Sequence, residues 1–132
     1  ELEIPDVTFS TIINMPSSDF QKIIRDLGPL SEKLEIKSVA SELIFKCSGS
    51  FATAEIRRTE SDGSMEFQLK PNEMKIIQGE FSLKNLGYFI KCTNLCNQIE
   101  MYLENDLPLV VKYNVASLGE IKLCLAPLPS NC

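Results

Sequence analysis

Hydrophobic and polar residues are patterned most regularly near the end of the chain, where two runs predict a β-hairpin. Residues 109–115 form a β-branched run that begins just after a proline, and apolar and polar side chains alternate strictly over residues 120–125. A period of two is typical of a half-buried strand. Residues 116–119 supply the turn, and Pro127 and Pro129 end the second strand because proline has no N–H to donate to a ladder.

Two other segments repeat apolar residues three and four positions apart, which is the spacing of an amphipathic helix. The first follows Pro16 and ends at Gly28-Pro29, and the second runs from about Ser82 to Thr93. Their apolar stripes are Phe20, Ile23, Ile24 and Leu27 in the first segment and Leu83, Leu86 and Ile90 in the second. We therefore expect two helices about sixty residues apart, each with one buried face.

Serine residues are the expected N-caps of these helices. Ser17 or Ser18 precedes the first apolar stripe and Ser82 precedes the second, and a serine hydroxyl can accept a hydrogen bond from a free N–H of the first turn. Gly87 lies inside the second helix, where glycine costs up to about 1 kcal/mol relative to alanine. That cost predicts close packing against Gly87.

Short β-rich runs fill the rest of the chain. They fall at residues 8–15, 34–39, 43–48, 51–59, 65–69, 74–81 and 99–103. The resulting order predicts a duplicated β-α-β-β-β unit, with a short link between the copies. Two helices cannot cover both faces of this much sheet. We therefore expect an α+β fold in which both helices pack side by side on one face of antiparallel sheets.

Composition narrows the possible functions. The chain has 132 residues, 44% of them hydrophobic, which suits one folded domain with a real core. No apolar run approaches the ~20 residues of a membrane span, so no membrane partner is expected. The chain starts with Glu and has no signal peptide, which predicts a fragment or processed chain. The net charge of −5 argues against nucleic-acid binding unless the basic residues gather on one face.

Catalytic and metal-binding patterns are missing from the sequence. The chain has five cysteines, no C-x-x-C pair and no histidine, which argues against zinc and for reduced thiols in an intracellular protein. Glu104 and Asp106 are the nearest approach to a carboxylate pair, and we interpret them as a solvated hairpin end. Cys92 and Cys96 lie four apart, and we interpret them as packed or idle thiols. We therefore expect no enzyme activity, cofactor or metal.

Basic residues on the two predicted helices favour a phosphate-binding surface. Lys22 and Arg25 lie opposite the apolar stripe of the first helix, and Lys84 and Lys91 lie two turns apart on the second. Lysine and arginine ordinarily decorate solvent-facing surfaces, so one such helix would mean little. Two in an acidic chain favour binding to phosphates without readout of base sequence.

Several segments of the chain, in this order, resemble a known family. They are Leu2-Glu3-Ile4-Pro5, residues 15–20 (MPSSDF), residues 23–27 (IIRDL), residues 86–91 (LGYFIK), residues 106–113 (DLPLVVKY) and Leu125-Ala126-Pro127. Together they resemble the eukaryotic-type DNA sliding clamps, the proliferating cell nuclear antigen family. The resemblance implies that residues 1–5 end an interdomain linker and that residues 6–132 form the C-terminal clamp domain, without the N-terminal one.

The resemblance also implies a function without catalysis in the nucleus. Such a clamp is a ring whose hole is lined by helices, and it acts as a processivity factor for DNA polymerase and a docking platform for replication and repair proteins. The implied partners are encircled double-stranded DNA, DNA polymerase, a clamp loader and peptides of the PIP-box type. We expect a homotrimer for the full-length protein and a monomer for this chain, since both trimer contacts need the other domain.

Three sets of site residues follow from the resemblance. The DNA-facing set is Lys22, Arg25, Lys84 and Lys91. The pocket for partner peptides is bordered by Leu2, Ile4, Pro108, Leu109, Ala126 and Pro127, with the rest supplied by the absent domain. The subunit-interface strand comprises Phe51, Thr53, Glu55, Ile56, Arg57, Arg58 and Thr59.

The chain departs from the family pattern at a few positions. Cys124 replaces a common tyrosine of the pocket, Ala40 replaces a lysine that accepts ubiquitin, with Lys37 nearest, and Ala52 and Ala54 stand where glycine is frequent. These departures keep an alternative open, a diverged clamp paralogue that acts as a protein-interaction module without a homotrimeric ring. A small-molecule or enzymatic domain is disfavoured because convergent polar groups are missing.

Overall fold

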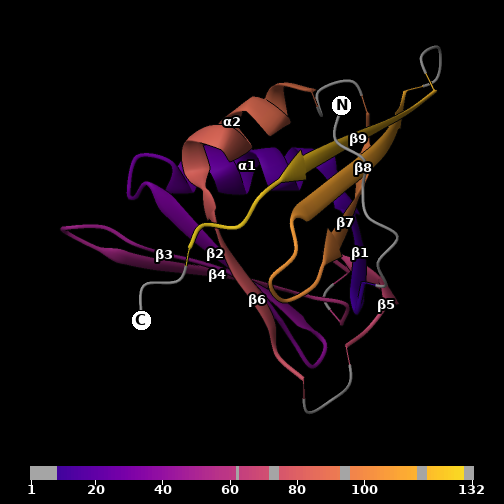
Figure 1. The fold of residues 1–132 in the computed structure, drawn as a ribbon, viewed down its shortest axis with the longest axis horizontal. Helices are drawn as coiled ribbons and strands as arrows, with labels where there is room; N and C mark the ends of the chain where they lie inside the picture. The colour runs from indigo at the N-terminus through magenta and orange to yellow at the C-terminus, as the bar shows by residue number, and fades with distance from the viewer. Residues whose placement is uncertain (1–8, 62, 72–74, 93–95, 116–118, 130–132) are drawn as a thin grey trace.

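The computed structural model describes residues 9–61, 63–71, 75–92, 96–115 and 119–129. Within them the chain forms two helices and nine strands (Figure 1). The first half contains β1 (Thr11–Pro16), α1 (Ser17–Leu27), β2 (Lys33–Val39), β3 (Glu42–Ser48), β4 (Thr53–Thr59) and β5 (Glu66–Leu69). The second half contains β6 (Ile77–Ser82), α2 (Leu83–Cys92), β7 (Gln98–Leu103), β8 (Leu109–Val115) and β9 (Gly119–Leu125).

The strands form two antiparallel sheets that confirm the predicted duplication. One sheet has the order β5-β1-β7-β8-β9 and the other has the order β4-β3-β2-β6. Each β-α-β-β-β unit lends its first strand to the other unit, because β1 pairs with β7 and β6 pairs with β2. The predicted C-terminal hairpin is also confirmed: β8 and β9 pair from Leu109 opposite Leu125 to Val115 opposite Gly119. Its turn at 116–118 lies outside the described residues.

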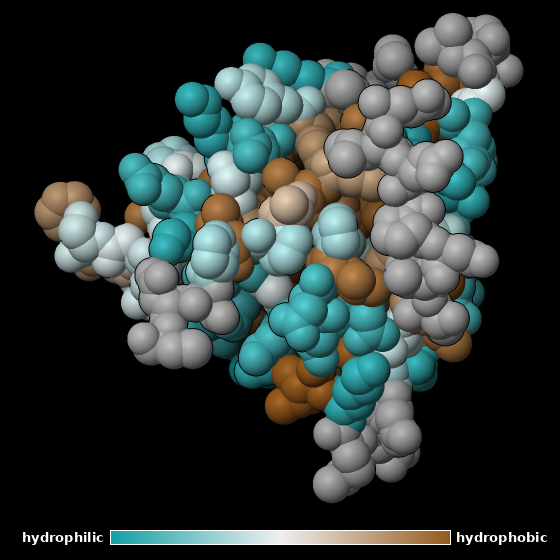
Figure 2. All heavy atoms as spheres, viewed as in Figure 1, coloured by the Kyte–Doolittle hydropathy of each residue, from teal (hydrophilic) through white to brown (hydrophobic). Residues whose placement is uncertain are grey.

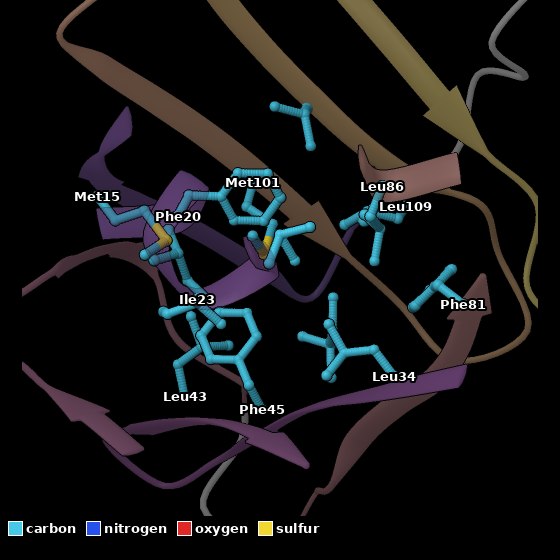
Figure 3. Packing of buried hydrophobic residues seen from close by; sticks show 14 of the residues in the cluster. Met15, Phe20, Ile23, Leu34, Leu43, Phe45, Phe81, Leu86, Met101 and Leu109 are labelled. Carbon is cyan, nitrogen blue, oxygen red and sulfur yellow. The ribbon is translucent and has the colours of Figure 1, made fainter. Parts of the chain in front are cut away.

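The core lies between the two helices and the inner faces of both sheets. Helices α1 and α2 contact each other on the same side of the molecule (Figure 1). Figure 3 shows side chains from both helices and both sheets, among them Phe20, Phe45 and Leu86, gathered in one interior. The predicted stripe of α1 is buried throughout, and in α2 Leu83 and Leu86 are buried whereas Ile90 is only partly buried. The predicted α+β class with paired helices is therefore confirmed.

The expected serine cap is correct for α2 and wrong for α1. The backbone N–H of Asn85 donates to Ser82 Oγ at 3.2 Å, so Ser82 caps α2. At α1 the N-cap is Pro16, which has no side-chain cap. Ser17 is buried and donates instead to the carbonyl of Cys96 at 2.6 Å. A tertiary contact thus replaces the local cap.

The expectation of close packing at Gly87 is wrong. A Cβ built on Gly87 meets no atom within 4 Å outside its own helix. The real glycine constraint lies at Gly49, between β3 and β4, where a Cβ would stand 1.9 Å from the carbonyl oxygen of Leu30. Neither described helix combines the length and apolar character that a membrane crossing requires.

Candidate nucleic-acid and partner surfaces

The four basic residues of the predicted DNA-facing set are all exposed. Lys22 and Arg25 lie on α1, and Lys84 and Lys91 lie on α2. Gln21 of α1 donates to the carbonyl of Ile90 in α2 at 3.5 Å, so the helices that carry them are joined directly. Figure 2 shows hydrophilic side chains along the outer rim of the region where Figure 1 places α2, with apolar side chains toward the centre of the molecule.

These four cations are also free of ion pairs among the residues that the structure describes. Six other basic residues form ion pairs at 2.7–3.5 Å: Arg57, Arg58, Lys70, Lys75, Lys112 and Lys122. On the helices, Asp19 is engaged by Arg58, and Asp26 is the other acidic residue. Four basic and two acidic residues give the helices a formal charge of +2 in a chain of −5. The helices therefore carry a net positive charge, whereas the rest of the chain is net negative.

An exposed aromatic ring lies within this surface. Tyr88 is 54% exposed on α2, and the Nζ atom of Lys91 lies 5.7 Å from the centre of its ring. This distance is within the range of a cation–π contact, which favours a defined position for the long Lys91 side chain.

The predicted subunit-interface strand is an edge of the four-stranded sheet. In the described part of the chain β4 pairs with β3 alone. Thr53, Glu55, Ile56 and the rest of residues 53–59 lie in β4, but Phe51 lies before the strand and is 100% exposed. The expectation that Phe51 belongs to the strand is therefore wrong, because the chain first turns at Gly49, whose N–H donates to the carbonyl of Ala52 at 2.8 Å.

Charged side chains of β4 are fixed by ion pairs. Arg57 contacts Glu42 at 2.9 Å and Glu55 at 3.0 Å on the outer face of the sheet. Arg58 makes a two-bond contact with Asp19 of α1, from Nε to Oδ2 at 2.8 Å and from Nη2 to Oδ1 at 3.0 Å. The edge strand is thus tied to the N-terminal turn of the helix that carries Lys22.

The predicted peptide pocket is only partly present among the described residues. Pro108 and Pro127 are half-buried and Ala126 is exposed, whereas Leu109 is 0% exposed in the core. Leu2 and Ile4 lie outside the described residues. In the described part of this region, the surface available to a partner comes from Pro108, Ala126 and Pro127.

The positions that depart from the family pattern are placed as follows. Cys124 is half-buried on β9, opposite Val110. Ala40 is exposed at a positive φ of 54° in the turn between β2 and β3, and Lys37 is half-buried on β2.

The acidic pair at the hairpin end has a structural environment that the sequence did not predict. Glu104 has a side chain only 14% exposed, and it accepts hydrogen bonds from Ser10 and from the backbone N–H of Asn105, while Lys75 approaches it at 3.2 Å. The interpretation of a solvated hairpin end is therefore wrong for Glu104. Asp106 has a φ of 65°, so it forms the tight turn that follows.

Cys47 is buried and Cys96 is half-buried among the described cysteines. Burial raises the pKa of the Cys47 and Cys96 thiols, which disfavours the reactive thiolate. The side chain of Cys92 lies outside the described residues. No cluster of three or more His, Cys, Asp or Glu side chains suited to a metal occurs in the ranges that the structure describes.

Sequence reasoning missed the polar contacts that hold the edges of the sheet. Asn105 bonds the backbone of residues 76 and 78, and Arg58 bonds Asp19. An asparagine beside a turn was a usable signal, because its amide can replace a peptide group. The Arg58–Asp19 pair spans 39 positions and has no local signal.

Comparison with known proteins places this arrangement among the sliding clamps. The family model described as "Proliferating cell nuclear antigen, C-terminal domain" matches residues 3–128. A "Probable DNA polymerase sliding clamp" of Acanthamoeba polyphaga mimivirus is 38% identical over 128 residues, covering 97% of this chain and 27% of the relative. A "Probable DNA polymerase sliding clamp 1" of Paramecium bursaria Chlorella virus 1 is 34% identical over 134 residues, covering 98% and 50%.

A solved structure has the same fold. The crystal structure of Proliferating Cellular Nuclear Antigen from Entamoeba histolytica superposes with a TM-score of 0.84 at 22% identity, covering 97% of this chain and 49% of that one. The chain thus spans half or less of the length of these relatives.

Proposed function

This chain belongs to the family of proliferating cell nuclear antigen C-terminal domains, and on that basis we propose that it forms the C-terminal half of a ring-shaped DNA sliding clamp. The complete clamp acts in the nucleus as a processivity factor for DNA polymerase and as a docking platform for replication and repair proteins. It acts by topology, as a non-catalytic ring around the duplex.

The observation that carries this proposal is the helical surface of Lys22, Arg25, Lys84 and Lys91. Its cations are exposed and unpaired within the described residues, in a chain whose net charge is −5. Long flexible cations meet phosphates without reading base edges, so the interaction suits a ring that slides. Each phosphate contact contributes about −0.9 to the slope of log affinity against log salt concentration.

Ring closure is assigned to β4. Its free edge is long enough to accept a strand from a neighbouring subunit, and the charges of Arg57 and Arg58 discourage accidental pairing. The full-length protein is then a homotrimer, and this chain alone is a monomer because it lacks the other half of each contact. Gel filtration of the two side by side tests this assignment.

Partner peptides are assigned to the apolar surface of Pro108, Ala126 and Pro127. Peptides of the PIP-box type and the clamp loader would place apolar side chains there, in the anchor-in-groove manner. Because the other half of the pocket belongs to the preceding domain, this chain alone should bind such peptides weakly. Nanomolar binding by this chain alone would contradict the assignment.

The decisive experiment loads the full-length protein onto nicked circular DNA and compares two triple variants. The first is Lys22→Glu, Lys84→Glu and Lys91→Glu on the helices. The matched control is Lys33→Glu, Lys37→Glu and Lys46→Glu on the outer face of β2 and β3, which makes the same charge change at cations that are also unpaired in the described structure. The helical variant should lose salt-sensitive retention on DNA, and the control should keep it.

Two results would overturn the proposal. Equal loss in both variants would mean that net charge alone sets the association. Undiminished retention of the helical variant, with Arg25→Glu added, would mean that the helices do not face DNA.

A further inference from the structure

Strand β6 forms the edge of the four-stranded sheet opposite β4. The N–H of Gln78 and the carbonyl of Glu80 bond to groups outside the sheet, at Asn105 Oδ1 and at the N–H of Leu128, both at 2.8 Å. Alternate residues of an antiparallel strand face the same neighbour. Ile76, Gln78 and Glu80 therefore direct their backbone groups away from β2.

The side-chain amide of Asn105 bonds to this edge in the way that the backbone of one residue of an added strand would. Its Nδ2 donates to the carbonyl of Ile76 at 3.0 Å, and its Oδ1 accepts from the N–H of Gln78. In a parallel ladder, a single residue bonds the carbonyl of one residue and the N–H two residues further along. The side-chain amide of Asn105 reproduces that pattern at Ile76 and Gln78.

The next equivalent position along β6 is vacant. The carbonyl of Gln78 and the N–H of Glu80 have no partner in the described residues, although both residues are exposed. Beyond them Leu128 resumes bonding at the carbonyl of Glu80. A cavity of about 620 Å³ lies here, lined by Gln78, Gly79, Glu80, Asn105 and the segment 127–129.

The walls of this cavity are acidic and partly apolar. Glu35, Glu80 and Asp106 line it, whereas Lys33 and Lys46 line the adjoining cavity together with Glu35 and Glu80. Glu35 and Glu80 are directly opposite each other in the β2–β6 register, where two like charges repel. Ile76, which also lines the cavity, is 47% exposed. Lys46 stands opposite Glu35 on the other side of β2, but none of the three carboxylates has an ion pair in the described residues, so a cationic occupant would be attracted to them and an apolar one would cover Ile76.

We propose that the cavity beside β6 binds an extended basic peptide that runs parallel to β6, with one residue bonded to the carbonyl of Gln78 and the N–H of Glu80. That residue lies beside Gly79. The residues before and after it direct their side chains to the face of Gln78 and Glu80, since side chains alternate along a strand. Lysine or arginine at those two positions meets Glu35 and Glu80, while a small apolar residue fits between them.

This site goes beyond the clamp function and does not depend on it. It adjoins the apolar surface of Pro108, Ala126 and Pro127 and shares Pro127 with it, but its other lining residues are different. The bonds it offers are those of strand addition, in which backbone groups supply affinity and side chains supply specificity.

The test uses the whole 132-residue chain and the peptide acetyl-Val-Lys-Val-Lys-Val-amide. In ¹H–¹⁵N NMR spectra the amide of Glu80 should shift on titration, with a dissociation constant of about 0.1–1 mM, as for a short peptide with few contacts. The same peptide with N-methylated central valine lacks the N–H for Gln78 and should bind about tenfold more weakly or not at all. The Val-Glu-Val-Glu-Val peptide should not bind.

Two substitutions separate the backbone contact from the charge. Glu80→Pro removes the outward N–H without touching the ladder to β2, whereas Glu80→Gln keeps the N–H and removes the charge. Binding should be lost in the first and weakened a few-fold in the second. Thermal melts verify folding, and if Glu80→Pro does not fold, the N-methylated peptide decides the backbone contact on the unaltered protein.

Four results would overturn the proposal. The first two are binding of the N-methylated peptide, or of the acidic peptide, as tight as that of the basic peptide. The third is absence of binding at several millimolar peptide. The fourth is a shift of the Glu80 amide that depends on protein concentration alone, which would assign the edge to a second copy of this chain. A fifth result, shifts centred on the amide of Leu109 beside Pro108 instead of Glu80, would also refute this site while leaving the clamp proposal intact.

Discussion

The two edges of the four-stranded sheet are protected in opposite ways. Strand β4 runs for seven residues with no described neighbour on its outer side, and ion pairs of Arg57 and Arg58 secure its side chains. Strand β6 is closed at one end by the amide of Asn105 and at the other by Leu128, which leaves one residue position open. An edge reserved for a long partner strand keeps its backbone clear, whereas an edge that must not pair widely is covered by local groups.

The largest effect on stability is expected from Gly49→Ala, which disrupts the turn that precedes β4. The new Cβ would lie 1.9 Å from the carbonyl oxygen of Leu30, and backbone must move to relieve the clash. Overpacking of this kind costs roughly 2–3 kcal/mol. Urea unfolding of the variant should show that loss in the free energy of unfolding.

Gly87→Ala is the matched control for this substitution. It adds the same methyl group at a helical position with no atom within 4 Å outside its helix. We expect it to stabilise the chain by up to about 1 kcal/mol, because alanine is the better helix former. Equal destabilisation by both substitutions would contradict the conclusion that Gly49 is crowded and Gly87 is not.

The next effect concerns the tie between β4 and α1. Arg58→Met removes a two-bond contact whose side chains are only 21% and 25% exposed, and Asp19→Asn removes its negative charge and one of its two acceptor oxygens. Hydrogen bonds to charged groups are worth about 1.5–3 kcal/mol when buried, and partial exposure reduces that figure, so we expect a loss of about 1–2 kcal/mol for each. The double variant should show a coupling energy of about 1 kcal/mol in a double-mutant cycle.

Arg57→Met tests whether removing any arginine from β4 lowers the free energy of unfolding as much as Arg58→Met does. Arg57 neighbours Arg58 in sequence, but its ion pairs lie on the exposed outer face. Its removal should change stability much less, since exposed pairs contribute little. A loss as large as that of Arg58→Met would show that the contact to Asp19 is not what matters.

Periodic hydrophobic patterns predicted most of the fold. The apolar stripes of residues 20–27 and 83–90 gave both helices, and strict alternation gave the hairpin of β8 and β9. These features depend on local spacing, which the sequence displays directly. The exchange of β1 and β6 between sheets was not predicted, because strand pairing depends on contacts between residues far apart.

The candidate surfaces were predictable to a lesser degree. The exposed helical cations could be named because a residue opposite an apolar stripe faces solvent. Leu109 and Phe51 were placed less well, since burial and turn position depend on neighbours from other strands. The bonds from Asn105 to β6 join segments 27 and 29 positions apart, and no pattern of spacing reveals such contacts.

A smaller effect is expected from removing the side chain of Asn105, which covers part of the edge of β6. Asn105→Ala takes away the bonds to Ile76 and Gln78 at an edge where water can replace them. We expect a loss of about 1 kcal/mol in the free energy of unfolding, together with about tenfold faster hydrogen exchange at the Gln78 amide. Asn105→Asp keeps the acceptor for that amide and should retain part of its protection. Unchanged exchange in Asn105→Ala would show that the side chain does not close the edge.

The smallest effect is a pH dependence that should appear at β6 and not at β4. Burial acts to raise the pKa of Glu104, but hydrogen bonds from Ser10, the N–H of Asn105 and Lys75 outweigh it and hold the pKa below the ordinary value. A carboxylate with a lowered pKa contributes stability that is fully present above its unfolded value of about 4.3 and is lost as the pH falls through the folded value. Because Glu104 orients Asn105, the protection of the Gln78 amide should fall over the same acidic range.

Glu60 provides the comparison, because it follows β4 directly and its pKa is also lowered, by hydrogen bonds from Lys70 and from the N–H of Phe67. Glu104→Gln should reduce the protection of the Gln78 amide at neutral pH and remove its acidic fall, whereas Glu60→Gln should leave both unchanged. Since intrinsic exchange itself depends on pH, the comparison is made on protection factors. If the protection factor of the Gln78 amide still fell by the same amount at acidic pH in the Glu104→Gln variant, another titrating group would control the hydrogen bond from Asn105 to β6. Glu104 would then not act on β6 through Asn105.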